Sequence, residues 1–102
     1  MRADAIQSIK AALSTVEHDR CILFGSRARG DAGGSSDYDL MIIVGRPCSQ
    51  SEKFAVANRI RSFLAERLIN ADVIVKSSDE VECYKELSGS IVRNALSEGV
   101  TI

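Results

Sequence analysis

Four stretches of the chain are predicted to be helices, three from their pattern of polar and apolar positions and one from the residues that open it. Residues 6–16, 51–69 and 90–98 repeat apolar side chains three or four positions apart, which places them on one helical face. A cluster of serines and acidic residues opens a fourth helix, 77–87. The apolar faces of the three periodic helices consist of Ile6, Ile9, Leu13 and Val16, of Phe54, Ala57, Ile60, Leu64 and Leu68, and of Ile91, Val92, Ala95 and Leu96.

Residue types that favour helix ends support these boundaries. Asp4 is expected to cap the first helix, and the serines at 49–51, which follow Pro47, are expected to cap the second. Gly99 follows the last helix directly, at the position where a glycine commonly ends one.

Short apolar runs at 21–24, 40–44 and 71–75 predict strands, and 100–102 can add a short edge strand. The run at 40–44 is apolar at every position, which favours a central strand that is covered on both faces. Because a helix connects this strand to the one at 71–75, the two should run parallel. We therefore expect an α+β fold, a two-layer α/β arrangement with a small mixed sheet of three to four strands.

The length and the net charge of the chain limit the classes of function that it can have. With 102 residues, of which 45% are hydrophobic and 26% charged, the chain has the size of a single domain, 1–102, without a separate substrate-binding domain. Its 13 Lys and Arg against 14 Asp and Glu give a net charge of −1, which argues against non-specific binding of nucleic acid. Any binding of phosphate must therefore depend on a local group of residues.

The cysteines and the hydropathy favour a cytoplasmic protein. Cys21, Cys48 and Cys83 are odd in number and irregularly spaced, which fits neither a disulfide framework nor a zinc site. The N-terminal residues lack the apolar run of a signal peptide, and no stretch approaches the roughly 20 apolar residues of a membrane span. We expect no membrane partner.

Three carboxylates are predicted to meet at one edge of the sheet. Asp37 and Asp39 lie two residues apart where a strand begins, so their side chains point to the same face. Asp72 begins the parallel strand and should lie beside them. Carboxylates this close repel one another unless they are protonated or bind cations, and oxygen ligands select Mg²⁺ or Mn²⁺. An Asp-x-Asp motif by itself is more often a solvated turn, so the interpretation depends on the residues around it.

The loop before this motif has the composition of a phosphate-binding turn. Gly25 lets a ligand approach the backbone closely, Ser26 supplies a hydroxyl, and the amides that follow could cradle phosphate oxygens. Arg27 and Arg29 add positive charge, although each could also be a solvated surface residue. The loop matches neither a P-loop nor a dinucleotide-binding fingerprint.

Residues 25–40 resemble the signature of the nucleotidyltransferase superfamily that includes DNA polymerase beta. That signature is Gly-Ser, ten residues, then Asp-x-Asp, and the spacing here fits without adjustment. Asp72, before an apolar run, resembles the third carboxylate of the family. The Ala-Arg-Gly after the Gly-Ser pair and the ending at 90–99 resemble the minimal nucleotidyltransferases that serve as antitoxins of HEPN-domain toxins.

The resemblance implies a fold, an activity and a role for each residue. It implies a polymerase-beta-like nucleotidyltransferase fold in which Asp37 and Asp39 bind two Mg²⁺ ions, and Asp72 binds one of them and helps to deprotonate the acceptor hydroxyl. Gly25 and Ser26 would hold the β and γ phosphates of the donor, ATP. The expected activity is that of a Mg-dependent protein adenylyltransferase.

The resemblance leaves open which molecule accepts the nucleotide. By resemblance, a HEPN-domain toxin would be adenylylated on a tyrosine and silenced, and the chain would form either a homo-oligomer or a hetero-oligomer. Two alternatives stay open: an antitoxin that neutralises its toxin by binding alone, and transfer to a small molecule. Tyr38 alternates with the acids along the strand, so we expect its ring to pack in the core rather than stack on a base.

Overall fold

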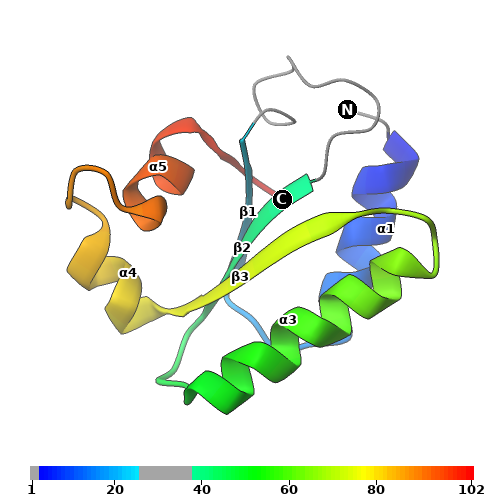
Figure 1. The fold of residues 1–102 in the computed structure, drawn as a ribbon, viewed down its shortest axis with the longest axis horizontal. Helices are drawn as coiled ribbons and strands as arrows, with labels where there is room; N and C mark the ends of the chain where they lie inside the picture. Colours follow the sequence, from blue (N-terminus) through cyan, green and yellow to red (C-terminus); the bar gives the residue numbers. More distant parts are fainter. Residues whose placement is uncertain (1–2, 26–37) are drawn as a thin grey trace.

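The computed structural model describes residues 3–25 and 38–102, which form four helices and four strands (Figure 1). None of the described helices is long and apolar enough to cross a membrane. In chain order the elements are α1 (Ala3–Leu13), β1 (Arg20–Phe24), β2 (Tyr38–Val44), α3 (Gln50–Ala65), β3 (Ala71–Ser77), α4 (Ser78–Tyr84), α5 (Ile91–Glu98) and β4 (Val100–Thr101).

The strands form one mixed sheet in the order β3-β2-β1-β4. β1 runs antiparallel to both β2 and β4, whereas β2 and β3 are parallel. The parallel pair follows from α3, which carries the chain from the end of β2 back to the edge where β2 begins. The predicted α+β class, the mixed sheet and the parallel neighbours are confirmed.

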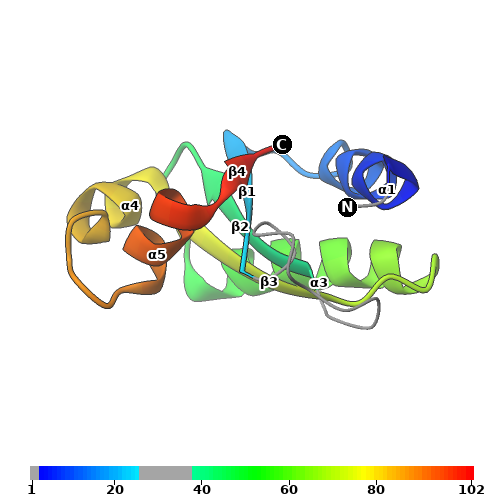
Figure 2. The ribbon, with the colours of Figure 1, turned by 90° about the horizontal axis from the view of Figure 1, so that it is seen from above.

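β2 is buried on both faces because helices cover both sides of the sheet. Leu40, Ile42 and Val44 pack in a core with residues of α1 and α3, while Met41 and Ile43 pack with residues of α4 and α5. Figures 1 and 2 show the sheet between these two pairs of helices. The short helices α4 and α5 thus add a partial second cover to the two-layer core that the sequence predicts.

Several predicted helix boundaries and faces were wrong. α1 already includes Ala3, so Asp4 lies within its first turn rather than at its cap. α3 ends at Ala65, and Leu68 follows with a φ of 60° and a side chain that is 93% exposed. Phe54 and Ile91 are also exposed, at 65% and 45%. Periodicity identifies the apolar face of a helix, but a narrow sheet covers only part of that face.

The predicted serine cap of α3 is confirmed in detail. The Ser49 side chain accepts a hydrogen bond from the Glu52 amide, and the Glu52 carboxylate accepts one from the Ser49 amide. This reciprocal arrangement satisfies two amides that have no partner inside the helix.

Gly99 ends α5 as expected, although not in the left-handed conformation that often accompanies such a glycine. Its φ is −87°, and a Cβ there would overlap the Ala95 carbonyl oxygen and the Ile22 side chain. Glycine at this position therefore allows α5 to end directly against β1.

An ion pair between Lys53 and Glu80 joins the beginnings of α3 and α4. Glu80 also accepts hydrogen bonds from the backbone amide and the hydroxyl of Ser77, at 3.0 and 3.1 Å. Burial alone would raise the pKa of Glu80, but the hydrogen bonds from Lys53 and Ser77 outweigh it and lower the pKa from 4.5 to about 2.

This depressed pKa predicts a loss of stability in acid. The stabilisation from Glu80 is complete above the unfolded value near 4.5 and disappears as the pH falls through the folded value near 2. We expect Glu80→Gln to remove roughly 2 kcal/mol of unfolding free energy at neutral pH and to flatten its decrease between about pH 5 and pH 2, as measured by urea unfolding. Glu82→Gln is the matched control, because Glu82 pairs with Lys85 but its side chain is 71% exposed. This substitution should change the unfolding free energy little at any of these pH values. An unaltered pH profile for Glu80→Gln would contradict this role.

Candidate active site at the edge of the sheet

Two of the predicted carboxylates meet where β2 and β3 begin. Asp39 and Asp72 are directly paired in the register of these parallel strands. Neighbouring strands lie about 4.8 Å apart, and paired residues point to the same face, so the two side chains are adjacent. This is the face that α4 and α5 cover farther along the strands.

The two carboxylates differ in exposure. Asp39 lies on a strand with a neighbour on each side and is half-buried, whereas Asp72 lies on the edge strand and is exposed. Asp72 is therefore the one of the pair that a second molecule can reach without displacing any described strand.

Gly25 lies against Asp39 because β1 and β2 are antiparallel. Phe24, the last residue of β1, pairs with Asp39, so the chain leaves β1 beside this carboxylate. Gly25 has a φ of +77°, a conformation that favours glycine, and a Cβ there would overlap Oδ2 of Asp39. Both the backbone conformation and the close approach require glycine at this position.

The structure adds Glu98, which the sequence analysis missed. Its carboxylate accepts a hydrogen bond of 3.3 Å from the Gly25 amide, so Gly25 contacts both Glu98 and Asp39. The tight contact of Gly99 with β1 places Glu98, the last residue of α5, at this edge. A glycine directly after an acidic helix end was the only sequence signal, and it gives no indication of the partner strand.

Four predicted site residues lie outside the described part of the chain: Ser26, Arg27, Arg29 and Asp37. Asp37 directly precedes Tyr38, the first residue of β2. Tyr38 itself is buried in the core with α1 and α3, so its ring packs as expected.

Residues 7–102 match the family "Polymerase beta, Nucleotidyltransferase". This chain belongs to that family. The match covers both strands that carry Asp39 and Asp72 as well as the turn at Gly25.

Two solved structures resemble this nucleotidyltransferase domain in fold. One is described as a crystal structure of "the toxin-antitoxin with AMP-PNP"; its TM-score is 0.59 at 19% identity, over 93% of this chain and 69% of the other. The second is a protein assigned as a nucleotidyltransferase from Sulfolobus solfataricus, with a TM-score of 0.50 at 23% identity, over 99% of this chain and 87% of the other. At these identities the similarity establishes the fold. No curated protein sequence matches the chain.

The carboxylate oxygens of the nucleotidyltransferase site are ligands that suit a hard cation. Among residues 3–25 and 38–102, no group of three His, Cys, Asp or Glu side chains is arranged to hold a metal ion. The described part of the site contributes two adjacent carboxylates, Asp39 and Asp72, and the sequence places Asp37 two residues before Asp39. Carboxylate oxygens are the ligands that Mg²⁺ prefers, so the residues present fit the ion that the family implies.

Proposed function

We propose that this nucleotidyltransferase domain transfers AMP from ATP to a tyrosine hydroxyl of a HEPN-domain toxin and thereby acts as its antitoxin. The observation that carries the proposal is the pairing of Asp39 with Asp72, with Gly25 packed against Asp39, in a chain of the polymerase beta family. The similarity in fold to a toxin–antitoxin structure with AMP-PNP supports both a nucleotide donor and a toxin partner.

The exposed carboxylate is assigned to the acceptor. Asp72 accepts the proton of the attacking hydroxyl, whose oxygen forms a bond to the α-phosphorus of ATP. The bond between the α-phosphorus and the oxygen that bridges to the β-phosphate breaks, and pyrophosphate leaves with its electron pair. Mg²⁺ held by Asp37, Asp39 and Asp72 would supply positive charge to the transferring and leaving phosphates.

The turn at Gly25 is assigned to the triphosphate. Since the Gly25 amide already donates to Glu98, the amides and the hydroxyl of the residues that follow are left to bind phosphate oxygens. The absence of a side chain on Gly25 lets the Asp39 carboxylate lie directly against this turn, so a triphosphate bound along the turn would lie beside Asp39. Ser26, Arg27 and Arg29 complete the proposed nucleotide site.

The proposal is tested by mixing the chain, MgATP and a HEPN-domain protein encoded beside it, then measuring the intact mass and the ribonuclease activity of that protein. We expect a mass increase of one or more AMP units together with a loss of activity. Loss of activity without a mass change would instead favour an antitoxin that acts by binding alone. An adenylylated small molecule formed without any protein partner would contradict the assigned acceptor.

Asp72→Asn tests whether Asp72 acts on the acceptor hydroxyl rather than in binding ATP. Because Asp72 is exposed and is assigned to the acceptor oxygen, the substitution should lower the rate of a single turnover by about a hundredfold or more. The dissociation constant of MgATP, measured by calorimetry, should change by less than about threefold. Comparable losses in rate and in nucleotide affinity would show that Asp72 acts mainly in binding ATP.

A further inference from the structure

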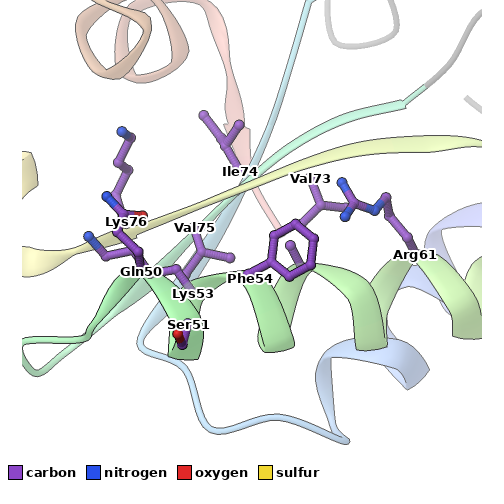
Figure 3. A pocket seen from close by; sticks show the side chains of 10 residues that line it. Gln50, Ser51, Lys53, Phe54, Arg61, Val73, Ile74, Val75 and Lys76 are labelled. Atoms are coloured by element: carbon purple, nitrogen blue, oxygen red, sulfur yellow. The ribbon is translucent and has the colours of Figure 1, made fainter.

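The outer edge of β3 is open in the part of the chain that the structure describes. β3 is the last strand of the sheet and pairs there only with β2. Its remaining peptide N–H and C=O groups point away from the sheet, and such an edge can accept a further strand. A groove of about 520 Å³ runs along this edge between α3 and β3 (Figure 3). We call it the β3 groove.

The middle of the β3 groove is apolar. Figure 3 shows the ring of Phe54 between α3 and β3, beside Val73 and Val75, and Ala57 lines the same groove. Phe54 is 65% exposed although it lies on the apolar face of α3. A large ring left exposed against a strand edge provides a contact for one apolar side chain of a docked segment.

All charged residues that line the β3 groove are basic: Lys53, Arg61 and Lys76. Lys53 is paired with Glu80, and the Lys76 side chain points away from α3 on the other side of β3, which leaves the charge of Arg61, near the Val73 end, on the α3 side of the groove. A second copy of this chain seated on the same edge would bring its own basic residues into the groove. The charge therefore favours an acidic segment of a different protein.

We infer that the β3 groove binds an extended segment of the partner protein in which an apolar residue and an acidic residue lie two positions apart, so that both side chains face α3. Such a segment would pair with β3 through main-chain hydrogen bonds, which supply affinity, while Phe54 and Arg61 select the side chains. Binding of this kind needs no deep pocket, only an open strand edge beside a helix.

The β3 groove leads directly to the proposed active site. It begins at Val73, the residue after Asp72, so a segment that pairs with β3 passes the exposed carboxylate as it leaves the groove. Docking there would hold the acceptor hydroxyl near Asp72. This consequence rests on the proposed function, whereas the binding of the segment does not.

The inference is tested by fluorescence anisotropy with a labelled synthetic peptide that repeats Ile-Thr-Glu-Thr, so that isoleucine and glutamate lie on the same face of the extended peptide. We expect the whole chain to bind this peptide, and Phe54→Ser and Arg61→Glu each to weaken binding by at least about tenfold. Arg59→Glu reverses a charge on the exposed surface of the same helix, outside the groove, and should leave binding within about twofold. Hydrogen exchange should show protection of the amides on the outer edge of β3 when the peptide is bound.

Besides a failure to bind the peptide, three results would overturn the inference. One is equal binding of a peptide with lysine in place of each glutamate, and another is displacement of the peptide by a single-stranded oligonucleotide. The third is sedimentation of the free protein as a dimer that Arg61→Glu dissociates, which would assign the groove to a second copy. Peptide binding without AMP transfer would contradict the proposed function alone, whereas AMP transfer without peptide binding would contradict this inference alone.

Discussion

Asp39→Asn is expected to lower the rate of AMP transfer by about a thousandfold or more, which corresponds to about 4 kcal/mol of transition-state stabilisation. Asn has nearly the same shape as Asp, so the strand pairing with Asp72 and the contact with Gly25 should persist while the negative charge is lost. That charge is the property by which the proposed site holds Mg²⁺.

Asp79→Asn is the matched control for this prediction, because Asp79 is an exposed residue of α4, which follows the far end of β3. Transfer should be measured with saturating MgATP and partner, and circular dichroism should show that both variants are folded. A folded Asp39→Asn variant with wild-type transfer would refute the role of Asp39.

Gly25→Ala is expected to reduce both stability and activity. An alanine here must adopt a φ of +77°, which side chains disfavour, and its methyl group would overlap Oδ2 of Asp39. Either the turn or the carboxylate therefore has to move. We expect a loss of about 1–3 kcal/mol in unfolding free energy and a decrease of about a hundredfold in the transfer rate.

Gly89→Ala distinguishes the effect of backbone strain from the effect of the overlap with Asp39. Gly89 has a similar φ of +85°, but a Cβ there would meet no atom within 4 Å. It should therefore lose about 1 kcal/mol of stability from backbone strain and retain full transfer activity. Equal transfer rates for the two alanine variants would show that the contact between Gly25 and Asp39 has no role in the reaction.

The arrangement of Asp39 and Asp72 could be predicted from the sequence because it follows from connectivity. A helix between two apolar runs makes the strands parallel, and parallel neighbours begin at the same edge. These steps use local pattern and chain topology, which a single sequence contains. The antiparallel direction of β1, which brings Gly25 to the same edge, was not among the predictions and comes from the structure.

Contacts between distant segments could not be predicted in the same way. Glu98 reaches Gly25 only because Gly99 allows α5 to end against β1, and periodicity does not specify which strand a helix end will meet. Phe54 shares helical spacing with Ile60 and Leu64, yet it lies beyond the cover that β3 provides. Its exposure depends on the width of the sheet, a property of the assembled fold.

The most direct test of AMP transfer compares two positions of the label in ATP. The chain, Mg²⁺ and the partner protein are incubated with ATP labelled on either the α- or the γ-phosphate, and the partner is then separated and counted. The proposed attack at the α-phosphorus predicts that the partner acquires the α label, that the γ label is released as pyrophosphate, and that Asp39→Asn abolishes both. Transfer of the γ label to the partner, or no transfer of either label by the folded wild-type chain, would contradict the proposed function.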